Sequence, residues 1–312
     1  MVELLDFSTI QSALTTQVFG RELAVLPRTG STNDVAKDLA ARGAPEGTVV
    51  VADEQTAGRG RLARRWLAPP CTCLLCSLLF RPDLPPIQAQ RLTMLCSLAA
   101  ADAIEQVAGL QVHLKWPNDL VAKSQIANRQ ISKSANRQIG NRKPAISNLQ
   151  SPISNFQPPT SNFQPPTWKK LAGILTETGI TGERLDFAVV GIGVNVNVGL
   201  EALPRLAPDA TSILAEVGCP VDRGALLVAL LAGVERRYQA LRAGESPHRE
   251  WAARLATLGQ PVEVSTPAGV LAGVAESVDE DGALLLRLPD GGLRVLVAGD
   301  VTLTLPDKAN RR

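Results

Sequence analysis

The hydrophobic pattern of this chain changes its period near Gly259, and this change constrains the architecture more than any other feature. Before it, helical stripes alternate with short β-branched runs, as in an α/β domain. After it, apolar residues alternate with a period of two in short segments that are separated by turn residues. Short, evenly spaced strands of this kind form small barrels. The sequence therefore predicts a mixed α/β domain followed by a small β-barrel.

The individual elements follow from the same pattern. Helices are expected over residues 32–42, 90–108, 224–243 and near 247–258, and strands over 48–53, 74–80, 111–116, 170–180 and 185–196. The barrel strands are expected over 261–265, 270–278, 283–288, 293–297 and 301–305. We therefore predict a first domain over residues 1–257, a second over 258–307 and a tail over 308–312.

Residues 122–168 differ from their surroundings in composition. The segment is rich in Asn, Gln, Ser and Pro, and the sequence SNFQPPT occurs twice in succession at 154–160 and 161–167. Lysines and arginines are frequent between 122 and 170, and acidic residues are absent. Such a stretch has too little apolar surface to offset the entropy lost on ordering it. We predict a disordered insertion in a surface loop, where added length reduces stability little.

Composition argues against several classes of protein. No run of about 18 uncharged apolar residues occurs, so no membrane span or membrane partner is expected. The first residues have no basic region of the kind that opens a signal peptide. The odd number of cysteines, five, argues against a disulfide framework, and the presence of only two histidines argues against most zinc hydrolases. The cysteines at 71, 73 and 76 are expected to pack as small apolar residues. We predict a cytoplasmic protein.

The stretch from 54 to 66 carries the strongest chemical signal. Its residues Gly58, Gly60 and Ala63 match the G-x-G-x-x-G/A dinucleotide fingerprint, but prolines at 69 and 70 follow in place of a helix. Four arginines, at 59, 61, 64 and 65, favour an anion instead. Glycines let backbone N–H groups approach a phosphate closely. The stretch is therefore predicted to be an anion-binding loop.

Three further motifs place polar side chains where apolar strands begin or end. They are KWPND at 115–119, KKLAGIL at 169–175 and GIGVNVN at 191–197. A carboxylate beside an amide can hold magnesium or accept a proton from an attacking amine. Each motif alone is more often structural, but four such motifs in one domain favour a shared pocket.

Together these motifs resemble the biotin protein ligases, the biotin–[acetyl-CoA-carboxylase] ligases. The resemblance extends over residues 23–305, apart from the insertion, and the matching pieces occur in the family's order. These pieces are STN at 31–33, Gln55, GRGR at 58–61 with Trp66, KWPND at 115–119, KLAGIL at 170–175 and GIGVN at 191–195. The resemblance implies an α/β (α+β) mixed-sheet catalytic domain of the biotin/lipoate ligase type with a C-terminal SH3-like β-barrel. It also implies ATP-dependent activation of biotin to biotinyl-5′-adenylate, and transfer to a lysine of the biotin carboxyl carrier protein of acetyl-CoA carboxylase.

The resemblance also implies roles for particular residues. Biotin would be bound by Ser31, Thr32, Asn33, Gln55, Arg59, Gly60, Arg61 and Lys170. The nucleotide would be bound by Gly58, Arg61, Trp66, Lys115, Asn118 and Asn195. Arg61, Lys115, Asp119 and Lys170 form the catalytic set, in which Asp119 either holds Mg²⁺ or accepts the carrier lysine's proton. The chain departs from the family at Ala63, where a third glycine is common.

Two alternatives stay open at this point. One is a lipoate or octanoate ligase of the same fold, and the other is a non-enzymatic nucleic-acid-binding protein that uses the basic loop, the insertion and the barrel. Few aromatic residues lie among the basic ones and the barrel is not basic, so we expect no specific DNA binding. The residues before the catalytic pattern are too few for an N-terminal DNA-binding domain, so we expect the form of the family that lacks it. A homodimer is compatible with the sequence but not specified by it.

Overall fold

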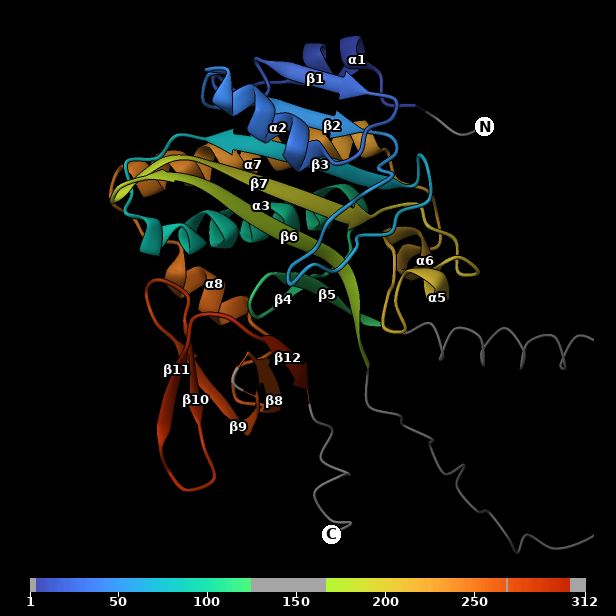
Figure 1. Ribbon diagram of the computed structural model, residues 1–312. Helices are drawn as coiled ribbons and strands as arrows, with labels where there is room; N and C mark the ends of the chain where they lie inside the picture. The colour runs from blue at the N-terminus through green and yellow to red at the C-terminus, as the bar shows by residue number, and fades with distance from the viewer. Residues whose placement is uncertain (1–3, 125–166, 268, 304–312) are drawn as a thin grey trace, which may run out of the picture.

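The structure is a computed structural model that describes residues 4–124, 167–267 and 269–303. A layered α/β region occupies most of the molecule, and a smaller β-sheet region lies at one end of it (Figure 1). Among the described residues, no helix is long and apolar enough to span a bilayer.

The larger sheet has seven strands in the order β1-β2-β3-β7-β6-β5-β4. They are β1 (Leu23–Leu26), β2 (Val49–Ala52), β3 (Cys73–Phe80), β4 (His113–Lys115), β5 (Asp119–Ser124), β6 (Thr167–Thr181) and β7 (Arg184–Asn195). β1 and β2 are parallel, whereas the other neighbouring strands are antiparallel, so the predicted mixed sheet is confirmed. β3 is buried along its whole length because its residues, CLLCSLLF, are all apolar or small.

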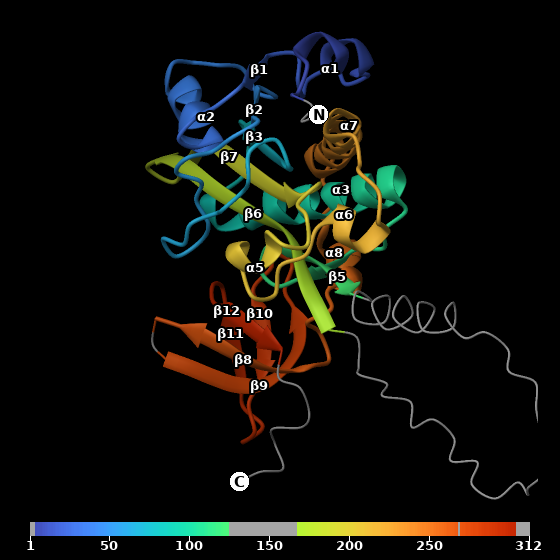
Figure 2. The same ribbon diagram turned by 90° about the vertical axis from the view of Figure 1, so that its right-hand side faces the viewer.

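Helices cover both faces of this sheet. α3 (Gln90–Ala108) and α7 (Arg223–Arg242) pack together on one face, and α2 (Thr32–Ala41) lies on the other (Figure 2). These three helices agree with the prediction to within a residue at each end, because each has a clear apolar stripe and a polar cap or glycine stop. The remaining helices are α1 (Phe7–Ala13), α5 (Leu203–Leu206), α6 (Ile213–Val217), α8 (His248–Arg254) and the 3₁₀ turn η1 (Pro86–Gln88).

The boundaries predicted for the insertion are wrong at both ends. Residues 122–124 continue β5 and residues 167–168 begin β6, with Ser124 opposite Thr167 and Lys123 opposite Trp168. The two strands are therefore antiparallel neighbours despite the long connection between them, as expected of a loop insertion. Residues 125–166 lie outside the described residues, so the disorder predicted for them stays a prediction.

The smaller sheet has five antiparallel strands in the order β11-β10-β9-β8-β12. They are β8 (Pro261–Thr266), β9 (Gly269–Val278), β10 (Leu284–Arg287), β11 (Leu293–Leu296) and β12 (Asp300–Leu303). Side chains such as Val262, Val264, Leu284 and Leu286 are buried at every second position, which gives the period of two read from the sequence. The sheet is consistent with the SH3-like barrel that was predicted. The ends predicted for strand 301–305 and for the domain at 307 lie outside the described residues.

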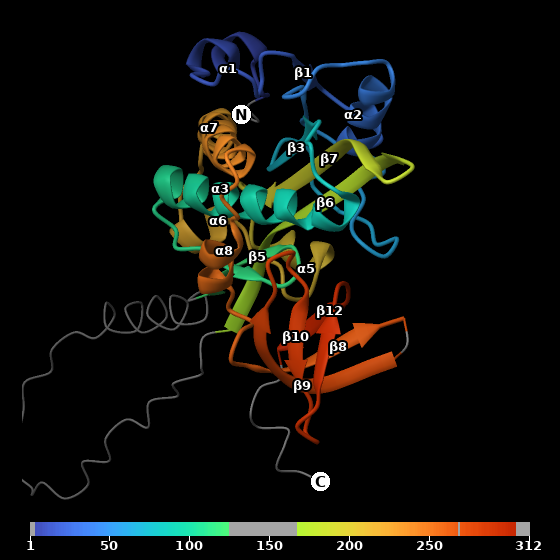
Figure 3. The ribbon, with the colours of Figure 1, turned by 90° about the vertical axis from the view of Figure 1, so that its left-hand side faces the viewer.

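Trp116 joins the two regions of the molecule. Its side chain is 1% exposed, and its indole Nε1 donates to the carbonyl of Gly282, 2.8 Å away in the turn between β9 and β10. Its backbone N–H donates to Thr257 Oγ1 at 3.0 Å. Beside it, Arg91 of α3 forms an ion pair with Asp281 at 2.8 Å. The smaller sheet is therefore docked directly against the KWPND motif, and Figure 3 shows it below α3 and α8.

All five cysteines are free thiols, and three of them are buried in the core. Burial raises the pKa of Cys73 to about 11 and that of Cys76 to about 12, and it also raises the pKa of Cys96 well above its ordinary value. These thiols therefore stay protonated near neutral pH. The packing role predicted for the cysteines at 71, 73 and 76 is confirmed for Cys73 and Cys76, whereas Cys71 is only partly buried and precedes β3.

Candidate functional site

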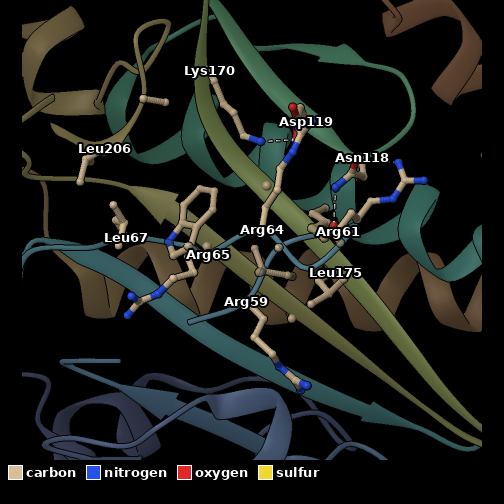
Figure 4. Close-up of a pocket in the computed structure, with 18 of the residues that line it drawn as sticks. Arg59, Arg61, Arg64, Arg65, Leu67, Asn118, Asp119, Lys170, Leu175 and Leu206 are labelled. Atoms are coloured by element: carbon tan, nitrogen blue, oxygen red, sulfur yellow. Dashed lines mark hydrogen bonds and ion pairs between the residues drawn. The ribbon is translucent and has the colours of Figure 1, made fainter. Parts of the chain in front are cut away.

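A cavity of about 600 Å³ lies between the 58–66 loop, strands β5 to β7, and the edge of the smaller sheet (Figure 4). This volume is typical of small-molecule sites. Every residue that the sequence analysis assigned to biotin or nucleotide lines the cavity, with the exception of Gly58. The smaller sheet contributes Ser265, Asp300, Val301 and Thr302, which no sequence motif indicated.

Lys170 and Asp119 form an ion pair at one end of the cavity. Lys170 Nζ lies 2.7 Å from Asp119 Oδ1 and 5.7 Å from the centroid of the Trp66 ring. The carboxylate oxygen makes no directional hydrogen bond within the described residues, so the contact is mainly electrostatic. The backbone of Lys170 is fixed on both sides. Its N–H donates to the carbonyl of Asp209 at 2.6 Å, and its carbonyl accepts from the N–H of Thr211 at 2.8 Å. The cation is therefore held by a rigid strand.

The 58–66 loop is a tight hairpin. Gly60 N–H donates to Arg64 C=O at 2.7 Å, and Arg64 N–H donates to Arg61 C=O at 3.1 Å. The two residues between the arginines, Leu62 and Ala63, have φ of 53° and 58°. Positive φ at both central positions is the geometry of a type I′ turn, which favours Asn-Gly. The turn in this chain is therefore built from residues that adopt it at a cost.

Gly58 has a structural role that differs from the nucleotide-binding role predicted for it. A Cβ at this position would lie 2.6 Å from the carbonyl oxygen of Trp66. The absence of a side chain lets Trp66 N–H donate to Gly58 C=O at 2.9 Å and close the base of the hairpin. Gly58 therefore shapes the loop and does not line the cavity.

The four arginines of the loop do not converge on one anion. Arg59 pairs with Asp34 at 2.6 Å and Glu177 at 2.8 Å, while Arg65 donates to the carbonyl of Thr56 at 3.2 Å. Figure 4 shows both of these side chains directed away from Lys170. Neighbouring acidic and carbonyl groups therefore bind Arg59 and Arg65 in this structure, and anion binding by the loop stays a prediction.

The other two arginines of the loop contact the smaller sheet. Arg61 donates to Asn118 Oδ1 at 3.2 Å and to the carbonyl of Gly299 at 3.4 Å, and Arg64 pairs with Asp300. Burial lowers the pKa of the Arg61 guanidinium, although the carboxylates of Asp300 and Asp119 partly oppose this effect. An arginine remains charged in spite of such a shift. Arg61 is therefore a desolvated cation beside the Lys170–Asp119 pair.

Two glycines form the part of the cavity wall under Trp66. Gly173 of β6 and Gly193 of β7 are paired in register, and the indole ring lies over both. A Cβ would lie 3.0 Å from the ring at Gly173 and 2.7 Å from it at Gly193. The buried Trp66 Nε1 has no hydrogen-bond partner among the described residues. The absence of side chains at the two glycines therefore lets the indole ring of Trp66 lie directly on strands β6 and β7.

Neutral polar groups occupy the opposite end of the cavity, at the N-terminus of α2. Gln55 Oε1 accepts from the N–H of Thr32 at 2.7 Å, and therefore caps the helix. Ser31 stands at the N-cap position, but its side chain makes no capping hydrogen bond. Asn33 is 4% exposed and donates to Glu177 Oε2 at 2.7 Å. Because Glu177 belongs to no motif, sequence analysis missed it.

The remaining predicted nucleotide residues lie on the nearby strands. Asn195 is buried at the end of β7 and donates to the carbonyl of Thr211 at 3.0 Å, which secures the segment that follows α5. Asn118 donates to the carbonyl of Ile174 at 2.6 Å and so spans from β5 to β6. Lys115 lines the cavity from the end of β4. The structure therefore brings the predicted motifs together, as the spacing at the strand ends suggested.

Comparison with known proteins agrees with this geometry. Residues 25–147 match the biotin/lipoate A/B protein ligase family, and residues 257–303 match the biotin protein ligase C-terminal domain. A bifunctional ligase/repressor BirA of Bacillus spizizenii is 31% identical over 302 residues, which cover 96% of this chain and 79% of that protein. A biotin--[acetyl-CoA-carboxylase] ligase of Mycobacterium tuberculosis is 32% identical over 289 residues, which cover 90% and 88%.

This chain belongs to the biotin protein ligase family. The biotin protein ligase from Aquifex aeolicus, solved in complex with biotin and ATP, aligns with a TM-score of 0.64 and 23% identity over 91% of this chain and 99% of that one. At this identity the likeness concerns the fold, which is the biotin protein ligase fold predicted. Membership of the family confirms that the chain is a ligase, and sets the non-enzymatic alternative aside.

Proposed function

We propose that this enzyme joins biotin to ATP, and then transfers the biotinyl group to a lysine of a biotin carboxyl carrier protein. The observation that carries the proposal is the polarity of the cavity. Neutral hydrogen-bonding groups lie at one end, at Thr32 and Gln55, where the nearby Arg59 is paired with Asp34 and Glu177. Cations lie at the other end, at Arg61, Lys115 and Lys170, together with the carboxylate of Asp119. Biotin has the same polarity, with a neutral ureido ring at one end and a carboxylate at the other. The names of the relatives, which are biotin--[acetyl-CoA-carboxylase] ligases, support the same substrate and carrier.

In the first step, a carboxylate oxygen of biotin attacks the α-phosphorus of ATP. An O–P bond forms, the bond between the α-phosphorus and its bridging oxygen breaks, and pyrophosphate leaves. Two anions must approach within bonding distance, so fixed cations at that point lower the barrier. Lys170 is assigned to the carboxylate–phosphate junction, and Arg61 and Lys115 to the phosphates. The glycine wall and Trp66 would hold the adenine or the loop above it.

In the second step, the amine of the carrier lysine attacks the carbonyl carbon of the adenylate. A C–N bond forms, AMP leaves with the electron pair of the C–O bond, and the amine must lose a proton. We assign Asp119 to accept that proton, because it is the carboxylate that lines the cavity beside Lys170. The ion pair with Lys170 also holds the Asp119 carboxylate at the wall of the cavity.

The residues that the structure describes include no cluster of side chains that would hold magnesium without help from a substrate. Among them, no group of three or more His, Cys, Asp or Glu side chains is placed to hold a metal ion. Asp119, which was a predicted ligand, has its Oδ1 2.7 Å from the ammonium of Lys170. Carboxylates that hold Mg²⁺ are usually joined by substrate phosphates. We therefore treat magnesium as part of the ATP substrate.

Lipoate and octanoate fit the neutral end of the cavity less well than biotin does. Neither molecule has a group that hydrogen-bonds to Thr32 and Gln55. A site built to hydrogen-bond its substrate rejects analogues that leave its buried polar groups unpaired. Biotin is therefore the substrate that the geometry favours.

The transfer step tests the proposal directly. The enzyme is mixed with ATP, biotin and a purified biotin carboxyl carrier domain, and the mass of the carrier is measured. We expect one biotinyl group on the wild-type carrier, and none when its acceptor lysine is replaced by arginine. An unmodified carrier with biotin, together with a modified one with lipoate or octanoate, would overturn the proposed substrate.

A further inference from the structure

Ser77 lies in the middle of β3, directly beneath the neutral end of the cavity. Its side chain is fully buried and does not line the cavity. Its hydroxyl oxygen lies 2.8 Å from Thr32 Oγ1 and 2.6 Å from Asn33 Oδ1. Ser77 therefore contacts the two residues that follow Ser31 without itself reaching a ligand.

The direction of the hydrogen bond between Ser77 and Asn33 follows from the surroundings of Asn33. The amide nitrogen of Asn33 faces Glu177 Oε2 at 2.7 Å and the carbonyl of Leu175 at 3.3 Å. Both of these groups only accept, so the nitrogen must point toward them and the amide oxygen toward Ser77. Gly191 makes room for that oxygen, since a Cβ there would lie 2.1 Å from it. Ser77 therefore donates its one proton to Asn33.

The direction of the second hydrogen bond follows from the first. Because Ser77 has used its proton, the 2.8 Å contact with Thr32 requires the Thr32 hydroxyl to donate. The alternative acceptor for that proton, Gln55 Oε1, is farther away at 3.1 Å. Gln55 Oε1 already receives the backbone N–H of Thr32 at 2.7 Å. Thr32 therefore presents its lone pairs to the cavity, and Gln55 has its Nε2 donor left over.

We infer that Ser77 is a positioning residue that fixes the hydrogen-bond polarity of the ring-binding end, making Thr32 an acceptor and the Gln55 amide a donor. This inference rests on the proposed function. A cyclic urea has N–H donors beside a carbonyl acceptor, so it matches an acceptor next to a donor. A site that holds its polarity in advance binds without reorienting its hydroxyls.

The variant that tests this inference is Ser77→Ala. Without the Ser77 oxygen, the Thr32 hydroxyl can turn its proton toward the ligand or toward Gln55. We expect the KM for biotin in pyrophosphate release to rise about tenfold, the effect of one buried hydrogen bond. The KM for ATP and kcat should change by less than about twofold, because Ser77 touches nothing at the cationic end.

A second readout separates polarity from packing. In the two cyclic carbamate analogues of biotin, one ring N–H is replaced by an oxygen that repels the Thr32 lone pairs. The ratio of the KM for the less favoured carbamate to the KM for biotin should be larger in the wild-type enzyme than in Ser77→Ala. In the variant, the Thr32 hydroxyl can donate to the ring oxygen, so the carbamate is penalised less. The matched control is Ser97→Ala, which removes a buried hydroxyl that donates to the carbonyl of Met94 in α3, at 2.7 Å.

Each outcome decides the question. An unchanged KM for biotin, an equal rise in both KM values, or an unchanged preference over the carbamates would overturn the inference. Ser77→Cys keeps a donor at this position, although a weaker one in a slightly larger side chain, so it should give an intermediate rise. It provides the test if Ser77→Ala does not fold. If wild-type enzyme released pyrophosphate with ATP and biotin but neither variant differed from it, only the role of Ser77 would fail. If wild-type enzyme did not turn over biotin, the proposed function would fail with it.

Discussion

Single residues decide the chemistry at the cationic end of the cavity. Lys170 is held by backbone hydrogen bonds on both of its sides and by an ion pair with Asp119. Such a side chain needs little reorganisation when a carboxylate and a phosphate meet beside it. The neighbouring Lys169 instead donates to the carbonyl of Pro208 at 3.3 Å, outside this contact.

Lys170→Ala should therefore reduce the rate of adenylate formation by about a hundredfold or more, which is the effect of one preorganised charge contact. The measurement is pyrophosphate release with ATP and biotin in a single turnover. Lys169→Ala provides the matched control, because it removes the adjacent lysine, and it should retain most of the rate. An equal loss of rate in the two variants would show that the positive charge of this segment matters and that the position of Lys170 does not.

Glu235 of α7 is a second residue with a testable role, here in stability. Its carboxylate accepts three consecutive backbone N–H groups, those of Gln17, Val18 and Phe19, at 2.6, 2.8 and 3.0 Å. Burial acts to raise the pKa of Glu235, but these hydrogen bonds outweigh it and lower the pKa below its ordinary value. A lowered folded pKa stabilises the protein above the unfolded pKa, and this stabilisation is lost as the pH falls through the folded pKa.

Glu235→Gln should lower the free energy of unfolding at pH 7 by about 1–3 kcal/mol, because one of the charged acceptor oxygens becomes a donor. The difference from wild type should narrow as the pH falls below roughly 4. Urea unfolding at several pH values measures both effects. Glu183→Gln, in the exposed turn between β6 and β7, serves as the control and should have little effect at any pH.

At the scale of elements, the turn at the tip of the 58–66 loop has an unusual backbone conformation for its residues. Leu62 and Ala63 both have positive φ, at 53° and 58°, which non-glycine residues adopt at a cost of about 1 kcal/mol or more each. The double variant Leu62→Asn, Ala63→Gly supplies the residues that a type I′ turn favours. Because the hairpin lines the cavity in which the adenylate would be held, we expect it to retain this intermediate. A more stable hairpin should therefore slow the release of the adenylate several-fold. A chase experiment with labelled adenylate measures this, with Ala68→Gly as a control that lies outside the turn.

A faster release from the double variant would show that the closed hairpin is not what retains the intermediate. The outcome also bears on what sequence can predict about this loop. The glycines and arginines of 58–66 correctly indicated a loop at the site. They did not indicate that Asp34 and Glu177 bind Arg59, because those partners lie 25 and 118 residues away along the chain.

Other elements were also predicted well where the signal is local along the chain, and missed where it depends on distant residues. The helices at 90–108 and 224–243 were predicted almost to the residue, since their apolar stripes and stop signals are local. β1 was missed because its four residues are only half-buried, at the edge of the sheet. The end of β5 was assigned to the insertion because the polar residues that follow it hide the strand pattern. Its partner β6 lies on the other side of the insertion. Pairing over such distances has no local signal.

At the scale of the whole molecule, the smaller sheet is part of the site. Asp300 and the carbonyl of Gly299 contact the arginines of the loop, and Trp116 fixes the sheet to the catalytic domain. The sequence predicted the barrel but not its contacts with the cavity, because no motif in residues 259–303 marks them. Trp116 was predicted only as part of the KWPND motif, and its contacts show that it also joins the two regions of the molecule.

Trp116→Phe should lower the free energy of unfolding by about 1–3 kcal/mol, because the carbonyl of Gly282 would lose its buried hydrogen-bond donor. Equilibrium unfolding in urea provides the measurement. Trp168→Phe is the matched control, since Trp168 is half-buried and packs by ring contact against His113. A Trp116→Phe loss no larger than that of Trp168→Phe would mean that the hydrogen bond contributes little to the docking of the sheet.

The rate of pyrophosphate release shows whether the cavity activates biotin with ATP. Wild-type enzyme with ATP is compared in the presence of biotin, lipoate and octanoate at equal concentrations. We expect release with biotin to exceed release with either of the other acids by at least about a hundredfold, because only biotin pairs with Thr32 and Gln55. Equal or faster release with lipoate or octanoate would contradict the account.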